Sequence, residues 1–253
     1  MKIRVLGAFG SEGRGQRPSA FLVNDRILVD AGTVTGALTV PEQLEIVHAL
    51  ITHAHFDHIG GLAYLTETLA SCGGKTPLRV TAVAPVVDAL RASAFNNVVW
   101  PDFTKIMVND QPVMEYRTLV DEAEQRVDDL WVTPVPVSHS VPASGFIIHD
   151  GEQGFVYSGD TGPTEALWKA IRGLRRLKAI ILECAFPDRL EPLAAAARHM
   201  TPSLIQRELD KLPADVPVWI FHVKPQFYDE TAEQIDKLGG RVSLVEQDKT
   251  YTL

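Results

Sequence analysis

Residues 52–61 read THAHFDHIGG, which places three imidazoles and one carboxylate within six positions, directly after the apolar run 49–51. Imidazole nitrogens and carboxylate oxygens are the ligands that suit zinc and similar transition metals. Side chains two positions apart at a strand end point the same way, so His53 and His55 should face one site. Asp57 and His58 follow at the start of the next turn and can face a second metal ion. The stretch therefore predicts a site for two ions that share a water.

A solvated polar turn is the alternative interpretation of this stretch. A single loop histidine is more often a turn residue than a ligand. Three histidines and an aspartate, placed between a buried strand and a helix predicted over 60–71, favour metal binding instead.

Four other segments carry residues of the same ligand types. They read VDAG at 29–32, VSHS at 137–140, YSGDTG at 157–162 and FHV at 221–223. Taken alone, His139 or His222 would more often be a packed histidine, and Asp160 would more often be a turn residue. Their interpretation as ligands depends on their occurring together, in this order, with the stretch at 52–61.

The five motifs resemble those of the metallo-β-lactamase superfamily, in type and order, over residues 3–245. The resemblance implies an α/β (α+β) fold, an αββα sandwich, formed by residues 1–253 as a single domain. The implied metal ligands are His53, His55 and His139 for the first ion, Asp57, His58 and His222 for the second, and Asp160 as a bridge between them. Asp30 would orient a ligand by a hydrogen bond. The ions would be divalent, with zinc expected first and manganese or iron as alternatives.

Further segments resemble one family within this superfamily, the class II 3′,5′-cyclic-nucleotide phosphodiesterases. They are residues 30–39, 95–103, 137–146, 157–164, 198–202 and 222–227. Phe56 departs from this family, which usually has leucine at that position. The resemblance implies hydrolysis of cAMP, with cGMP as a second candidate, to the 5′-nucleotide by a hydroxide held between the two metals.

Candidate catalytic and substrate-binding residues follow from the same resemblance. His199, together with Asp57, is a catalytic candidate, and His199 would stabilise charge on the phosphate or protonate the leaving oxygen. The alternative for His199 is a histidine that only precedes a helix at Pro202. Asn97, Trp100 and Phe103 would shape the nucleoside pocket, because aromatic faces stack on bases. Ordinary core packing is the alternative for these three residues.

The composition of the chain bears on its binding partners and on its cellular compartment. The chain has 253 residues, 45% of them hydrophobic, and a net charge of −8, which disfavours a broad nucleic-acid-binding surface. Its two cysteines are far apart in sequence and imply no disulfide framework, so we expect a reducing, cytoplasmic compartment. We expect no signal peptide, no membrane span, a small cyclic nucleotide as partner, and a homodimer as a candidate assembly.

The pattern of elements predicts two halves within one domain. Residues 1 to about 125 carry the first ligand cluster, and the rest carries the other ligands. The resemblance to the superfamily implies that each half supplies one sheet. The acidic segment 121–129 is predicted to be a solvated loop. The glycine-rich segment 7–15 lacks the spacing of a dinucleotide-binding loop, and we expect it to lie beside the metal site.

Two other functions stay open. Residues 183–186 and 199–202 also resemble late motifs of tRNA 3′-end endonucleases, and other phosphodiesterases share the fold. A non-hydrolytic dinuclear metal protein, with a redox or binding role, is the alternative of another class. His55 argues against the redox interpretation, because flavodiiron-type proteins usually carry glutamate there.

Overall fold

The computed structural model of the protein describes residues 1–74 and 77–253. Its strands are β1 (Lys2–Gly7), β2 (Ala20–Val23), β3 (Ile27–Val29), β4 (His48–Leu50), β5 (Leu78–Val83), β6 (Met107–Val108), β7 (Gln111–Pro112), β8 (Met114–Leu119), β9 (Gln125–Val127), β10 (Leu130–Pro136), β11 (Ser144–His149), β12 (Gly154–Tyr157), β13 (Leu177–Glu183), β14 (Val218–Phe221), β15 (Val242–Leu244) and β16 (Thr250–Thr252). Its α-helices are α1 (Val40–Gln43), α2 (Phe56–Cys72), α3 (Ala84–Ser93), α4 (Glu165–Ile171), α5 (Glu191–Ala197), α6 (Pro202–Glu208) and α7 (Tyr228–Leu238). The short 3-10 helices are η1 (Asp188–Leu190), η2 (Leu209–Lys211) and η3 (Pro225–Phe227). Within the described residues, no helix is both long enough and apolar enough to cross a bilayer.

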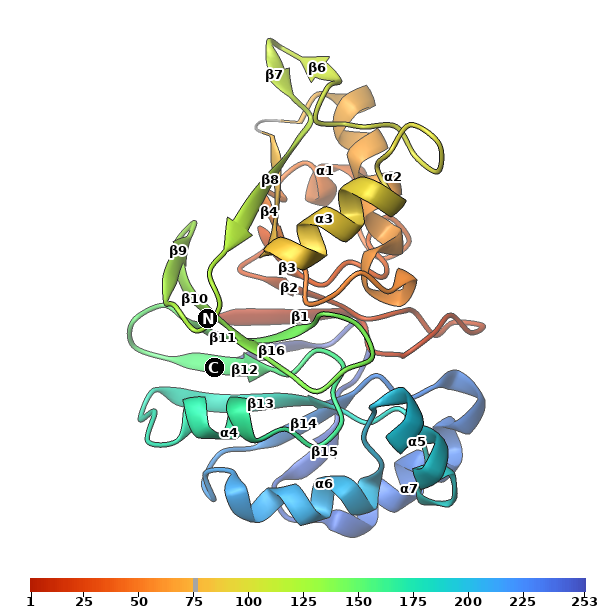
Figure 1. The fold of residues 1–253 in the computed structure, drawn as a ribbon, viewed down its shortest axis with the longest axis vertical. Coiled ribbons are helices and arrows are strands. Elements are labelled where there is room, and N and C mark those ends of the chain that lie inside the picture. The colour runs from red at the N-terminus through yellow and green to blue at the C-terminus, as the bar shows by residue number, and fades with distance from the viewer. Residues whose placement is uncertain (75–76) are drawn as a thin grey trace.

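Two seven-stranded sheets pack face to face, with helices outside them (Figure 1). The first sheet has the strand order β16-β1-β2-β3-β4-β5-β8, and the second has the order β15-β14-β13-β12-β11-β10-β9. Helices α1 to α3 lie on the side of the first sheet, and helices α4 to α7 lie on the side of the second. The predicted αββα sandwich is therefore confirmed.

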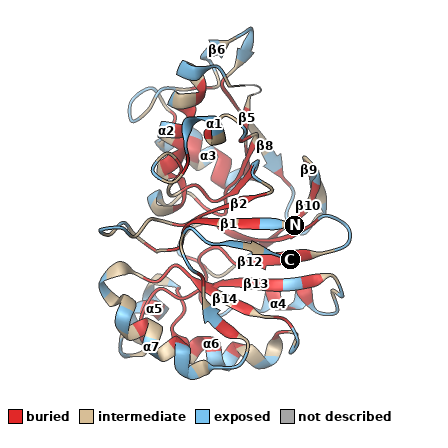
Figure 2. Ribbon diagram, turned by 180° about the vertical axis from the view of Figure 1, so that it is seen from behind, coloured by how far each residue is buried: buried red, intermediate tan, exposed pale blue. Residues whose placement is uncertain are grey.

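Strands β12, β13 and β14 run parallel and are apolar along most of their length. Such runs are typical of strands that are covered on both faces, here by helices and by the other sheet. Figure 2 shows buried residues along the strands and exposed residues on the outer sides of the helices.

Aromatic side chains join the two sheets. Phe21 of β2 packs against Tyr157 of β12 and Phe221 of β14, with ring centroids 4.8 to 5.5 Å apart within this trio. All three rings are buried. Tyr157 and Phe221 end their strands, so this packing anchors the two loops that carry Asp160 and His222.

Helix α2 begins earlier than predicted. It starts at Phe56 and not at Gly60, so Asp57 and His58 belong to its first turn instead of a preceding turn. An aspartate in the first turn is favourable, because the amino end of a helix carries partial positive charge.

Two other predictions are wrong in part. The acidic segment 121–129 is not all loop, because β9 lies within it and pairs with β10. The second half of the chain does not stay in the second sheet, because β16 returns to pair with β1 in the first. Both strands are three residues long, which is too short for a clear alternating pattern.

Candidate metal centre

Five of the seven predicted ligands, and the orienting residue Asp30, lie on loops at the carboxyl ends of strands, where the two sheets meet. In chain order, Asp30 follows β3, His53 and His55 follow β4, His139 follows β10, Asp160 follows β12 and His222 follows β14. Sheets of this kind form their sites at such an edge, because parallel strands deliver their following loops to the same side. Asp57 and His58 reach the edge from the first turn of α2.

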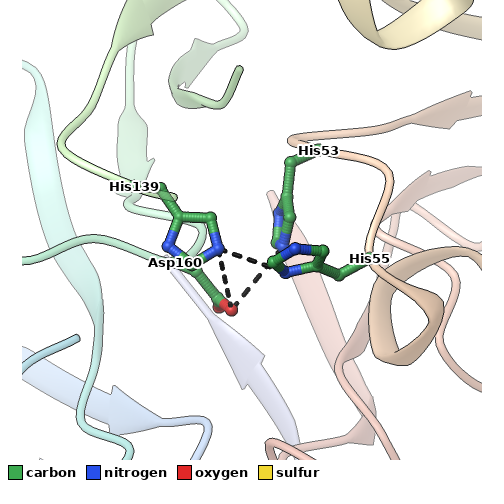
Figure 3. Close-up of side chains that lie close together, drawn as sticks. All are labelled: His53, His55, His139 and Asp160. Atoms are coloured by element: carbon green, nitrogen blue, oxygen red, sulfur yellow. Dashed lines mark hydrogen bonds and ion pairs between the residues drawn. The ribbon is translucent and has the colours of Figure 1, made fainter. Parts of the chain in front are cut away.

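Three groups of side chains that could hold a metal ion converge there: two match the predicted ligand sets, and the third joins Asp160 and His222 with His199. Within each group, the candidate ligand atoms lie within 4.8 Å of one another. The first group is His53, His55, His139 and Asp160 (Figure 3). The second group is Asp57, His58 and His222. The structure therefore brings all seven predicted ligands into one cluster that is able to bind metal ions.

Four atoms of this cluster are buried and have no hydrogen-bond partner among the described residues. They are Nε2 of His53, His58 and His222, and Oδ1 of Asp160. The Asp160 carboxylate lies 3.1 Å from both His58 Nε2 and His222 Nε2, yet neither contact is a hydrogen bond. Buried polar atoms are rarely left unpaired, and a bound cation would satisfy these lone pairs. The residues present therefore fit divalent metal ions.

The other ring nitrogen of these histidines is held by a neighbour. His58 Nδ1 lies 2.6 Å from Asp30 Oδ2, and His222 Nδ1 lies 3.0 Å from Ser19 Oγ. His53 Nδ1 lies 3.1 Å from the hydroxyl oxygen of Thr52. Metal-binding histidines usually have such a partner, which sets the ring orientation and leaves the opposite nitrogen free to coordinate.

Asp30 lies at the centre of this support. Its carboxylate accepts hydrogen bonds from the Thr52 backbone and hydroxyl groups and from the Tyr157 hydroxyl, each at 2.9 Å, besides its contact with His58. Its backbone φ is +54°, a left-handed conformation that aspartate tolerates better than most residues. Asp30 thus connects both sheets to one ligand, which is the orienting place predicted for it.

Asp160 contacts both groups. Its carboxylate lies 3.6 Å from His53 Nε2 on one side and 3.1 Å from His58 Nε2 on the other. Burial by itself would raise the pKa of Asp160, but the His222 and His58 imidazoles lower that pKa well below its usual range. The carboxylate is therefore negatively charged and available to a cation. Gly159 places it there with φ +58°, a conformation that favours glycine.

His199 lies at the rim of the cluster and pairs with Glu183. His199 Nδ1 is 2.7 Å from Glu183 Oε1 and 4.0 Å from Asp160 Oδ2. Burial by itself would lower the pKa of His199, but the Glu183 carboxylate raises it above the ordinary value. The Thr161 backbone N–H also donates to Glu183, at 3.0 Å, which fixes the carboxylate.

A cavity of about 680 Å³ opens beside Asp57. The glycine-rich segment predicted near the metal site lines one wall through Gly10 and Ser11, and α2 lines another. Lys224 reaches this wall, where its Nζ lies 3.4 Å from Asp57 Oδ2 and also donates to the Gly10 carbonyl. Burial by itself would raise the pKa of Asp57, but the nearby His222 and His58 imidazoles lower it.

The three predicted substrate-binding residues lie away from the cluster. Trp100 donates its indole N–H to the Ala63 carbonyl at 3.1 Å. Phe103 is buried in the main hydrophobic core, and Asn97 accepts a hydrogen bond from the Asp102 backbone at 2.9 Å. None of the three belongs to the described residues that line the cavity beside Asp57. Their contact with a substrate stays a prediction.

Sequence reasoning missed several residues that shape the site. Glu183 was noted only as part of a motif, although its place at the end of a buried strand was a usable signal. Lys224 lies two residues after His222 in a segment noted for its resemblance, yet no role was predicted for it. Ser19 and Tyr157 carried no local signal, because their partners are 203 and 127 positions away.

Comparison with known proteins agrees with this geometry. The Beta-lactamase superfamily domain model matches residues 25–245. A Yersinia pestis protein named "Probable 3′,5′-cyclic-nucleotide phosphodiesterase" is 30% identical over 203 residues, covering 70% of this chain and 57% of that protein. A Schizosaccharomyces pombe protein named "3′,5′-cyclic-nucleotide phosphodiesterase" is 28% identical over 182 residues, covering 63% of this chain and 49% of that protein.

The chain thus spans about half the length of these two relatives. Among solved structures, unliganded yeast PDE1 superposes with a TM-score of 0.83 and 19% identity, covering 100% of this chain and 99% of that one. This similarity extends over both sheets and the outer helices. The chain belongs to the beta-lactamase superfamily and has the metallo-β-lactamase fold.

Proposed function

We propose that the protein is a metal-dependent phosphodiesterase that hydrolyses 3′,5′-cyclic nucleotides to 5′-nucleotides. The observation that carries this proposal is the pair of ligand groups around Asp160, which lies next to a cavity of about 680 Å³. Cavities of this size accommodate small-molecule ligands. The names of the two relatives support a cyclic nucleotide, with cAMP as first candidate and cGMP as second.

The metal centre would hold two divalent ions, with zinc expected first and manganese or iron as alternatives. His53, His55 and His139 would hold one ion, Asp57, His58 and His222 the other, and Asp160 would contact both. Such ions polarise phosphate oxygens and lower the pKa of water, so that it can attack phosphorus at neutral pH. Imidazole-rich ligand sets suit zinc, copper, iron and nickel better than magnesium or calcium.

His199 would supply the proton for the leaving 3′ oxygen. Its Nδ1 is held by Glu183, so Nε2 is the nitrogen that can carry a proton to the substrate. The raised pKa keeps the imidazole protonated nearer to neutral pH, which a general acid requires. The water oxygen bonds to phosphorus, the bond from phosphorus to the 3′ oxygen breaks, and that oxygen takes the proton from His199.

Lys224 would add positive charge on the Asp57 side of the phosphate. Its ammonium group lies at the cavity wall and is partly exposed there. We also propose a reducing, cytoplasmic compartment, since Cys72 is exposed, Cys184 is buried and both are free thiols. A homodimer stays a prediction.

The test is 5′-AMP release from 3′,5′-cAMP by purified protein loaded with zinc, manganese or iron. Asp160→Ala should abolish release, whereas Asp210→Ala, at an exposed aspartate on the outer layer, should leave it unchanged. Bis-p-nitrophenyl phosphate serves as a generic phosphodiester. If the loaded protein cleaves that compound but leaves cAMP and cGMP intact, a cyclic nucleotide is not its substrate.

A further inference from the structure

Helix α2 presents two aromatic side chains to the cavity beside Asp57. Phe56 and Tyr64 both line this cavity, and they are 74% and 58% exposed. Single exposed aromatic residues are common on protein surfaces, but these two share one hollow that also reaches a candidate metal ligand. Neither ring is buried in the core, so core packing does not explain why both rings line this cavity. Binding of a ligand would explain it.

Gly60 lies between the two aromatic residues on the same helix face, because positions four apart stack along a helix. It also lines the cavity. A Cβ atom at Gly60 would come 3.3 Å from Cδ1 of Phe56, so the Phe56 ring leans over this glycine. Gly60 adds no side chain of its own between Phe56 and Tyr64, so it does not cover the exposed faces of these two rings.

Trp100 supports Tyr64 from behind. The two rings meet edge to face, with centroids 5.8 Å apart, and the Trp100 indole N–H is anchored to the Ala63 carbonyl. Tyr64 is therefore held in place although it is exposed. A rigid aromatic ring loses little conformational freedom when it binds a ligand.

Two charged residues that line the cavity, Asp57 and Lys224, contact each other beside the metal cluster. Asp57 and Lys224 mark the side next to the metal cluster, while Phe56, Gly60 and Tyr64 extend away from it along α2. A phosphate at the cluster would leave the rest of a nucleotide to extend over the aromatic end. The charged residues Asp57 and Lys224 thus suit the phosphate, and the aromatic residues Phe56 and Tyr64 suit the base.

We propose that Phe56 and Tyr64 form the nucleobase site of this enzyme, with Gly60 as its floor. The base stacks on the Phe56 ring, Tyr64 closes the far end, and Trp100 is a positioning residue that acts through Tyr64. This inference rests on the proposed function. Stacking on an aromatic face is available to every base, so the site accepts both adenine and guanine.

A second hollow offers a competing position for the base. It has a volume of about 310 Å³, lies beside His55, and is lined mainly by apolar residues of α2, α3 and the loop at 141–142. Phe56 borders both hollows, whereas Tyr64 and Gly60 line only the larger one and Ala89 only the smaller one. Variants at these three positions can therefore separate the two hollows.

The experiment compares cAMP with an abasic substrate, the 3′,5′-cyclic phosphate of methyl riboside. For Tyr64→Ala and Phe56→Leu, we expect KM for cAMP to rise about 5-fold to 100-fold, the loss typical of one base–aromatic stack. We expect kcat to change less, and the abasic substrate to show no such rise. Binding of a fluorescent cAMP analogue to the metal-loaded protein gives a second readout. Gly60→Ala should also raise KM for cAMP while thermal stability is unchanged or higher, since alanine favours a helix interior.

Ala89→Trp fills the smaller hollow and should leave KM for cAMP unchanged. The proposal is overturned if Tyr64→Ala and Gly60→Ala bind cAMP as the wild type does, or if Ala89→Trp is the variant that raises KM. Equal losses for cAMP and the abasic substrate would also overturn it, because the rings would then act on the metal centre. If the wild-type protein leaves all cyclic nucleotides intact, the proposed function is wrong, and the proposed base site is wrong with it.

Discussion

Replacing Asp30 with asparagine should weaken binding of the second metal while most of the fold stays intact. The Thr52 backbone N–H donates to Oδ1 of Asp30, and the Thr52 hydroxyl lies 2.9 Å from both carboxylate oxygens. Oδ2 also lies 2.9 Å from the Tyr157 hydroxyl and 2.6 Å from His58 Nδ1. Asparagine has the same shape and also tolerates the left-handed backbone at this position. The substitution therefore changes one atom, the one that faces His58.

The consequence follows from the tautomer of His58. Beside a carboxylate, Nδ1 carries the proton and Nε2 keeps its lone pair for the cluster. An asparagine that keeps its Thr52 contacts turns its NH2 group toward Nδ1, which must then accept a hydrogen bond. The proton of the neutral imidazole moves to Nε2, and a protonated nitrogen cannot bind a metal.

The magnitude can be estimated from these contacts. Loss of a partner that orients a metal-binding residue lowers metal affinity about 10-fold to 100-fold. Here His58 itself would stop binding the metal, so we expect affinity to fall by at least about 100-fold. One hydrogen bond to a charged group is lost and the Tyr157 hydroxyl must turn, so the free energy of unfolding should fall by about 2–3 kcal/mol. A 100-fold loss of metal affinity equals about 2.8 kcal/mol, so the two effects should be similar in free energy and a control variant must separate them.

Tyr157→Phe is the matched control. It removes one hydrogen bond to the same carboxylate oxygen but leaves His58 in its metal-binding tautomer. We expect about 1–2 kcal/mol lower stability by urea unfolding, with an unchanged metal-to-protein ratio by mass spectrometry and unchanged affinity in chelator competition. If Asp30→Asn holds both metals with wild-type affinity, the tautomer argument is wrong.

Three further predictions concern the acid, the packing of α2 and the pH dependence of stability. Glu183→Gln should lower kcat for cAMP about 100-fold but have a smaller effect on bis-p-nitrophenyl phosphate, whose leaving group needs no proton; equal losses would contradict an acid role for His199. Gly61→Ala should lower the free energy of unfolding by about 1–3 kcal/mol, because the new Cβ would lie 2.8 Å from the Ala31 carbonyl oxygen and 2.9 Å from the Val34 nitrogen. Urea midpoints that match those of Gly60→Ala would refute this packing argument. Burial, followed by the charge of Arg79, lowers the pKa of His48 from 6.5 to about 4. The unfolded chain therefore binds a proton that the folded chain does not, so stability should be full above pH 6.5 and fall as the pH drops toward 4. In His48→Leu, unfolding curves across this range should show a smaller loss, and an unchanged slope would exclude His48 as the cause.

Most of the fold could be predicted from local patterns, and the exceptions have identifiable causes. The start of α2 was misplaced because its N-cap is His55, which lacks the usual serine, threonine or aspartate signal, and because Gly60 and Gly61 disfavour a helix interior. Gly61 is there for a tertiary reason, since any side chain would meet the backbone of the loop at 31–34. The strand β9 was hidden among acidic residues, and only its pairing with β10 reveals it.

The same division holds for the candidate site. The cluster at 52–61 could be identified from sequence because its residues are adjacent, and local strand and helix geometry aims them at one place. The contact of Asp30 with His58, by contrast, spans 28 positions, and that of Ser19 with His222 spans 203. No local periodicity encodes such pairs, because they exist only after two sheets have packed.

The sequence by itself determined the ligand types and their order, since these depend on side-chain chemistry within short segments, and it indicated the layered fold through the resemblance of its motifs to the metallo-β-lactamase superfamily. Only the tertiary structure decided which ring nitrogen of each histidine faces the cluster, because that choice belongs to distant partners such as Asp30 and Ser19. It also decided that the cavity beside Asp57 is bordered by Phe56 and Tyr64, while Asn97 and Phe103 lie elsewhere. An exposed and a buried aromatic residue look alike in sequence, and they differ only in what packs around them.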